Sequence, residues 1–115
     1  MNSYRELVVW QRGMELVEEI YKIVRFLPKE EMYALSDQMR RAAVSIPSNI
    51  AEGFARKAPK DYARFLLMAR GSKYELETQL IICERLKYLS ADDIKRAMGL
   101  CDEIGKMLNS IIAKL

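Results

Sequence analysis

Apolar residues recur at steps of three and four along most of the chain, which is the period of an amphipathic α-helix. The first stripe predicts a helix from about 7 to 26. A proline follows Leu27 and should end this helix, because the residue before proline avoids helical dihedral angles. The stripe consists of Val9, Leu16, Ile20, Ile23 and Leu27, with Val17 and Val24 widening it.

A second stripe predicts a helix that begins near Lys29 or Glu30, where acidic residues favour the positive end of the helix dipole. Pro47 lies inside this stripe. A proline within a helix removes one backbone hydrogen bond and usually bends the helix. Because the stripe continues on both sides of Pro47, we predict one kinked helix. Its apolar positions are Leu35, Met39, Ala42, Ile46, Ile50 and Phe54.

The third predicted helix starts at Pro59, a residue that suits the first helical position, and runs to about Tyr88. The small residues Gly71 and Ser72 within it suggest a close contact with another helix. The apolar stripe of this helix is Tyr62, Phe65, Leu66, Ala69, Leu76, Leu80 and Cys83.

Ser90 begins the fourth predicted helix as its N-cap, and Asp93 three residues later resembles the acid of a capping box. Heptad spacing of the apolar residues is typical of left-handed helix packing. The residues at this spacing are Ile94, Cys101, Leu108 and Leu115, and the alternate positions hold Met98, Ile104 or Gly105, and Ile111.

These four patterns define the expected fold. The connections between them are short, which makes neighbouring helices antiparallel. No segment shows the alternation typical of strands. We therefore predict an all-α protein: an antiparallel up-down-up-down four-helix bundle, with one domain over residues 1–115 and the second helix kinked at Pro47.

The composition is that of a folded globular protein, with half of the 115 residues hydrophobic and 30% charged. No apolar run approaches the roughly 20 residues that span a bilayer, and the N-terminus has no secretory signal pattern. Cys83 and Cys101 lie inside apolar helical patterns. We interpret them as reduced core residues, with a disulfide between two helices as the alternative. We expect a cytoplasmic protein without a membrane partner.

The chain contains no histidine. This excludes Ser-His and Cys-His nucleophile pairs and the Glu-x-x-His motifs of di-iron bundles. The two cysteines are too far apart in sequence for a zinc motif, and no Gly-rich phosphate loop is present. We therefore predict no catalytic residues, no metal site and no cofactor, in a protein that is not an enzyme.

Basic residues are concentrated in the middle of the chain. The net charge is only +3, but residues 38–73 hold eight basic residues against two acidic ones. Arginine suits phosphate because its planar fork can contact two oxygens, and aromatic residues such as Tyr62 and Tyr74 can stack on bases. The candidate nucleic-acid-binding residues are Arg40, Arg41, Arg56, Lys57, Lys60, Arg64, Arg70 and Lys73.

Those cations have a second interpretation. They can pair with acids such as Glu75 and Glu77, within or between the subunits of a protein-assembly scaffold that has no nucleic-acid role. The sequence alone leaves both functions open, and we expect nucleic-acid binding with the scaffold as the alternative.

Polar residues cluster around the proline of the second helix, at Ser45, Ser48, Asn49 and Glu52. The structural interpretation is that they satisfy the backbone carbonyl freed by Pro47 and fix the kink. Glu52 also precedes a basic residue, Arg56, by four positions, which favours a helix ion pair. The alternative interpretation is a polar ligand pocket at the kink.

Three stretches, at 7–10, 33–53 and 65–80, together resemble the four-helix-bundle proteins encoded in intervening sequences of bacterial 23S ribosomal RNA genes. Lys73 and Tyr74 depart from the family pattern. The most specific stretch reads Arg40-Arg41-Ala42-Ala43-Val44-Ser45-Ile46-Pro47-Ser48-Asn49-Ile50-Ala51-Glu52-Gly53.

The resemblance implies a bundle whose subunits form a ring-like homopentamer. It also implies similarity to the accessory variability protein of diversity-generating retroelements, which works with a reverse transcriptase and binds nucleic acid through a basic surface. The expected partners are therefore further copies of the chain, RNA or DNA, and, by analogy only, a reverse-transcriptase-like protein.

Overall fold

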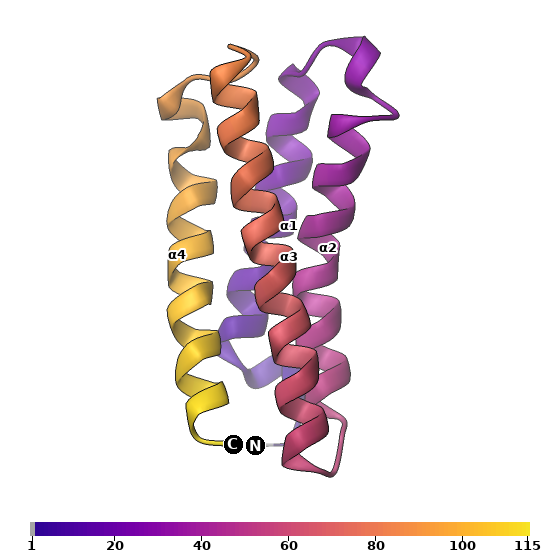
Figure 1. Cartoon of the computed structure of the whole chain (residues 1–115), viewed down its shortest axis with the longest axis vertical. Helices are drawn as coiled ribbons and strands as arrows, with labels where there is room; N and C mark the ends of the chain where they lie inside the picture. The colour runs from indigo at the N-terminus through magenta and orange to yellow at the C-terminus, as the bar shows by residue number, and fades with distance from the viewer. Residues whose placement is uncertain (1) are drawn as a thin grey trace.

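Four long helices lie side by side in the computed structural model, which describes residues 2–115 (Figure 1). No strand occurs in that range, so the all-helical prediction is confirmed. The long helices are α1 (Val8–Ile23), α2 (Leu35–Phe54), α3 (Pro59–Arg85) and α4 (Ala91–Ala113). Three short 3-10 helices accompany them: η1 (Tyr4–Glu6), η2 (Val24–Phe26) and η3 (Lys29–Glu31).

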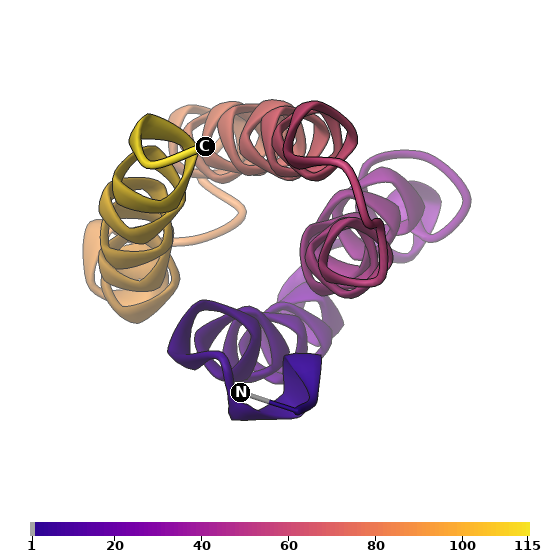
Figure 2. The same cartoon turned by 90° about the horizontal axis from the view of Figure 1, so that it is seen from below.

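The long helices surround a common core. α1 contacts α2 and α4, and α3 contacts the same two helices from the other side (Figure 2). The α1–α2 and α3–α4 connections lie at one end of the molecule, whereas the α2–α3 turn and both termini lie at the other end (Figure 1). The particle measures 43 × 24 × 19 Å. Within residues 2–115, no helix combines the length and the apolar character that a membrane span requires.

The predicted apolar stripes meet in this core, as expected for amphipathic helices that bury one face. The prediction is wrong for Leu115, which lies beyond the end of α4 and is 45% exposed. Burying one such side chain contributes roughly 1.5–3 kcal/mol. The largest side chains that are fully buried include Leu16, Ile20, Met39, Ile46, Ile50, Leu66, Leu76, Leu80, Ile104 and Leu108.

Both cysteines are buried in the core as free thiols, so the core interpretation is confirmed and the disulfide alternative is wrong. Burial raises the pKa of Cys83 to about 11. Burial also raises the pKa of Cys101, to about 12. Both side chains therefore stay protonated at neutral pH, where a thiol is a poor nucleophile.

The second helix begins later than predicted, at Leu35. The 3-10 helix η3 occupies residues 29–31, and Ala34 has φ −122° and ψ −104°, outside the helical region. Glu31 accepts hydrogen bonds from the Leu35 amide at 3.4 Å and from the Tyr88 hydroxyl at 2.8 Å. These contacts hold residues 27–34 as a distinct loop between α1 and α2.

The third helix ends at Arg85, three residues earlier than predicted. Lys87 has a left-handed φ of 63°. Its amide donates to the Glu84 carbonyl at 3.0 Å, and the Tyr88 amide donates to the Cys83 carbonyl at 2.9 Å. This is the Schellman motif, which usually has glycine at the left-handed position, so a lysine there gave no sequence signal.

The capping box predicted for the fourth helix is confirmed. The Asp93 amide donates to the Ser90 hydroxyl at 3.1 Å, and the Ser90 amide donates to the Asp93 carboxylate at 2.8 Å. α4 therefore starts immediately after Ser90.

Close helix contacts occur at glycines other than Gly71. Gly71 is exposed and a Cβ there would meet nothing within 4 Å, so the predicted helix contact is wrong for Gly71. It is confirmed for Ser72, whose hydroxyl donates to the Ser45 hydroxyl of α2 at 2.8 Å. A Cβ on Gly53 of α2 would lie 2.8 Å from the Phe65 Cβ of α3. Gly105 of α4 faces Lys73 of α3, because a Cβ there would lie 3.2 Å from the Lys73 Cε.

Candidate nucleic-acid interface

Pro47 is buried inside α2, which continues as one helix on both sides of it. The proline ring packs against Gly13 of α1, where an added Cβ would lie 3.4 Å from the Pro47 Cβ. The missing side chain at Gly13 thus makes room for the ring at the α1–α2 contact.

The polar cluster next to Pro47 joins α2 to α3. The Asn49 side-chain amide donates to the Ser45 carbonyl at 2.8 Å and to the Ser45 hydroxyl at 2.9 Å. The Ser72 hydroxyl of α3 donates to the same Ser45 hydroxyl at 2.8 Å. The polar cluster was predicted to satisfy the backbone carbonyl freed by Pro47, which is that of Ala43. Asn49 contacts the Ser45 carbonyl instead.

The other two polar residues near Pro47 lie elsewhere. Ser48 is exposed beside the apolar groove between α1 and α2, which Trp10 and Met14 also line. Glu52 is exposed and does not form the predicted ion pair with Arg56, although the structure describes both residues. The cluster therefore acts mainly as a link between two helices.

Four of the predicted cations gather at the α2–α3 turn. We call Arg56, Lys57, Lys60 and Arg64 the turn cluster. All four are exposed, and none forms an ion pair with another residue of the described range 2–115. The guanidinium carbons of Arg56 and Arg64 each lie 4.7 Å from the centroid of the Phe65 ring. Such contacts orient the planar groups and leave N–H donors for an anion.

Three other predicted cations lie away from the turn cluster. Arg41 pairs with Asp37 at 3.0 Å, and Arg70 donates to the Asn109 side chain at 3.0 Å. Arg40 donates to the Met32 carbonyl at 3.2 Å, near the α1–α2 loop. At about 1.5 Å of rise per residue, Arg40 lies about 21 Å from Phe54, the last residue of α2 before the turn cluster. The basic segment therefore reaches both ends of the bundle.

Lys73 is not available to a ligand, because its side chain is buried between α3 and α4, with 6% of the residue exposed. Its ammonium lies 2.6 Å from the Glu77 carboxylate and 3.9 Å from the centroid of the Tyr74 ring. Glu75, which was also expected to pair with a cation, instead accepts a hydrogen bond from Gln79 at 3.2 Å.

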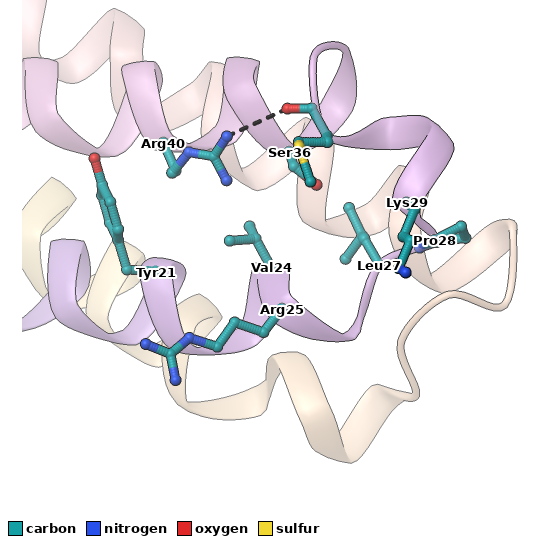
Figure 3. A pocket seen from close by; sticks show the side chains of 9 residues that line it. Tyr21, Val24, Arg25, Leu27, Pro28, Lys29, Ser36 and Arg40 are labelled. Carbon is teal, nitrogen blue, oxygen red and sulfur yellow. Dashed lines mark hydrogen bonds between the residues drawn. The ribbon is translucent and has the colours of Figure 1, made fainter.

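Two cations that sequence reasoning missed lie at the opposite end from the turn cluster. Arg25 and Lys29 line a pocket together with Arg40 (Figure 3). Both precede the basic segment 38–73 and so lie outside the stretch whose net charge drew attention. Lys29 is in addition followed directly by two acids, Glu30 and Glu31. A usable signal was present: no acid lies three or four positions from Arg25 on either side.

The α1–α4 face differs from both ends because its charges pair. Arg12 lies 2.9 Å from Glu15 and 3.0 Å from Glu103, and Arg96 lies 3.7 Å from Glu19. The hydrogen bonds to Glu103 and Glu15 raise the pKa of Arg12. Arg12 and Arg96 thus lie next to carboxylates, unlike the arginines of the turn cluster.

These features define a class of protein: a four-helix protein with a group of exposed cations at its α2–α3 turn. In the described part of the chain, no group of three or more carboxylate or thiol side chains is placed to hold a metal ion. The chain belongs to the family of 23S rRNA-intervening sequence proteins, whose family model matches residues 5–110. The family resemblance seen in the sequence is thereby confirmed.

A solved structure supports the same assignment. The chain is similar to a crystal structure of a protein with unknown function from the S23 ribosomal protein family of Bacteroides thetaiotaomicron. The two are 27% identical with a TM-score of 0.84, and the alignment covers 90% of this chain and 97% of that one. Comparison with curated proteins gave no match.

Proposed function

We propose that this protein is a non-enzymatic, cytoplasmic homo-oligomer that binds structured RNA or DNA through the turn cluster. The observation that carries the proposal is the group of four exposed cations at the α2–α3 turn, outside any ion pair within residues 2–115. A family named after an insertion in a ribosomal RNA gene is consistent with a nucleic-acid context.

The proposed subunit is an antiparallel up-down-up-down bundle bent at Pro47, and the proposed assembly is the homopentamer that the family resemblance implies. Repeating the turn cluster around a ring would multiply a modest local field and add avidity. Arg56 and Arg64 would contact phosphate oxygens with their outer donors while Phe65 keeps them in place. A reverse-transcriptase-like partner, as used by the accessory variability protein, enters the proposal by analogy only.

Neutralising Lys57 and Lys60 tests the nucleic-acid role. We expect the Lys57→Gln/Lys60→Gln variant to bind a labelled structured RNA at least about tenfold more weakly, and to show a shallower salt dependence, because each lost phosphate contact reduces counterion release. The matched control is Lys95→Gln/Lys106→Gln, which removes the same charge from exposed positions on α4.

Fluorescence anisotropy at several salt concentrations measures both quantities. Equal weakening by the two double variants would show that only total charge matters and would refute the assignment to the turn cluster. Absence of binding by the unaltered protein at low salt would refute the nucleic-acid role altogether and leave the scaffold.

The outer face of α3 supports the oligomeric part of the proposal. Leu67, Tyr74 and Ile81 recur there every seven residues and are exposed, and Met68 and Ile82 lie beside them. α3 is thus apolar on its outer side as well as on its core side. A row of this kind is typical of a seam between helices, and a second copy of the chain would bury it. This face also favours the alternative function, a protein-assembly scaffold.

A charge in this row should prevent assembly. We expect Ile81→Glu to reduce the mass measured by light scattering from that of an oligomer to the 13.4 kDa of one chain, because a carboxylate cannot be buried without a partner. Val8→Glu on α1 is the control, since Val8 is 48% exposed and Ile81 is 40% exposed. An unaltered mass for Ile81→Glu would place the interface elsewhere.

A further inference from the structure

The pocket at the α1–α2 end is separate from the turn cluster. It lies between the end of α1, the 27–34 loop and the start of α2, and has a volume of about 520 Å³ (Figure 3). That volume falls within the range of about 300–1,000 Å³ typical of small-molecule sites. The buried side chains of Val24 and Leu27 form part of its wall, together with the side chain of Ser36.

The charged residues that line this pocket are all cations. They are Arg25, Lys29 and Arg40, and none of the three forms an ion pair within the described residues. Arg40 donates one hydrogen bond, to the Met32 carbonyl, and has further N–H donors. Figure 3 shows their charged groups spread around the rim of the hollow, where together they make its potential positive and favour an anion.

The nearby acids are engaged with other residues or point elsewhere. Glu31 accepts hydrogen bonds from Tyr88 and from the Leu35 amide. Asp37 pairs with Arg41, and Arg41 is the residue that follows Arg40 in sequence. Glu30 is exposed and does not line the pocket. The positive potential in the hollow is therefore not cancelled by a carboxylate in its wall.

Aromatic side chains accompany these cations. Tyr21 lines the pocket, and the guanidinium carbon of Arg40 lies 6.0 Å from the centroid of its ring. Phe26 and Tyr33, which adjoin the lining residues in sequence, are 71% and 90% exposed. Exposed rings next to arginines suit a planar base attached to a phosphate, because bases stack on aromatic faces and phosphates accept from arginine.

We propose that this pocket binds a nucleotide, with its phosphate on Arg40 and its base against Tyr21, while Arg25 and Lys29 add positive potential at the rim. The nucleotide can be free or the end of a single strand, because both present the same phosphate and base. The site is distinct from the turn cluster and does not depend on the nucleic-acid role proposed for that cluster.

Calorimetric titration tests the proposal on the full chain with three probes: inorganic phosphate, adenosine monophosphate and a short 5′-phosphorylated single-stranded oligonucleotide. We expect Arg40→Gln to weaken binding of the nucleotide probe by about tenfold, the effect of losing one charged hydrogen bond. Arg25→Gln should weaken binding by less, because Arg25 contributes potential and no direct contact. Arg41→Gln is the control, because Arg41 is the neighbour of Arg40 and pairs with Asp37. Circular dichroism melting shows whether each variant is folded.

A second comparison distinguishes contacts to the base from contacts to the phosphate. It also distinguishes the end of a strand from a free nucleotide as the ligand. Tyr21→Leu should weaken binding of adenosine monophosphate and leave inorganic phosphate unaffected. Binding of adenosine monophosphate assigns the pocket to a free nucleotide, and binding of the oligonucleotide alone assigns it to a strand end. Either result supports the proposal if Arg40→Gln weakens that binding by about tenfold.

The proposal is overturned if none of the three probes binds, or if Arg40→Gln and Arg41→Gln have equal effects. Lys57→Gln/Lys60→Gln should leave binding of adenosine monophosphate unchanged. Failure of the turn cluster to bind RNA would therefore not be confused with failure of this pocket.

Discussion

Glu77→Leu is expected to lower the free energy of unfolding by about 3 kcal/mol, the lower end of the range for removing one partner of a buried ion pair. The reason is that the Lys73 ammonium would stay buried against Gly105 without a carboxylate. The lower end of the range applies because 20% of the Glu77 side chain is exposed, so the ion pair is not fully removed from water. Urea denaturation measures the change.

A double-mutant cycle separates the energy of the Lys73–Glu77 ion pair from the other effects of each substitution. Lys73→Met combined with Glu77→Leu should return the stability to within about 1 kcal/mol of the unaltered protein, because well-packed apolar residues can replace a buried pair. The control is Asp37→Leu, which breaks the exposed Arg41–Asp37 pair of the same i,i+4 spacing and should cost less than about 1 kcal/mol. Equal losses for Glu77→Leu and Asp37→Leu would contradict the internal role of Lys73.

Gly53→Ala is the second large effect that we expect. The added Cβ would lie 2.8 Å from the Phe65 Cβ and 3.0 Å from the Tyr62 Cδ1, so α2 and α3 would have to separate. Overpacking of this kind costs about 1–3 kcal/mol, which exceeds the gain of about 0.5–1 kcal/mol from replacing glycine in a helix. The melting temperature should therefore fall.

Gly99→Ala provides the matched control with the opposite sign. Gly99 lies in the middle of α4, where an added Cβ would meet nothing within 4 Å. The same substitution should there raise the free energy of unfolding by about 0.5–1 kcal/mol, because only the helix preference changes. Thermal melts measure both variants. If the melting temperatures of Gly53→Ala and Gly99→Ala changed in the same direction, the close α2–α3 contact at Gly53 would be refuted.

The core was predictable because burial follows directly from helical spacing. Residues such as Leu16, Ile46 and Leu80 recur at the period that places them on one face, and that face is buried. The capping box at Ser90 was predictable for a similar reason, since both of its hydrogen bonds join residues three positions apart.

Helix ends that depend on distant contacts were not predictable. The loop before α2 is held by the hydrogen bond between Glu31 and Tyr88, which are 57 positions apart. A sequence pattern with a period of three or four residues carries no information on such a contact. Lys87 takes a left-handed conformation that sequence rules assign to glycine.

The candidate interface was predicted in part, because net charge along a segment does not show which cations are paired. α3 is apolar on both sides, so the apolar residues alone did not show whether Lys73 faces the core or the solvent. Its heptad position did show this, because Lys73 stands seven positions from both Leu66 and Leu80, which are buried. Arg56 and Arg64 were predicted as phosphate-binding residues, but their shared contact with Phe65 follows only from the folded turn.

The position of the two chain ends affects how this protein can be labelled. The described chain begins and ends at the end of the bundle that carries the α2–α3 turn (Figure 1). A purification tag or fluorescent fusion on either terminus would therefore add charge and bulk beside Arg56 and Lys57. Affinities measured with such a fusion would mix its own interactions with those of the turn, so the tag should be cleaved before any titration with RNA.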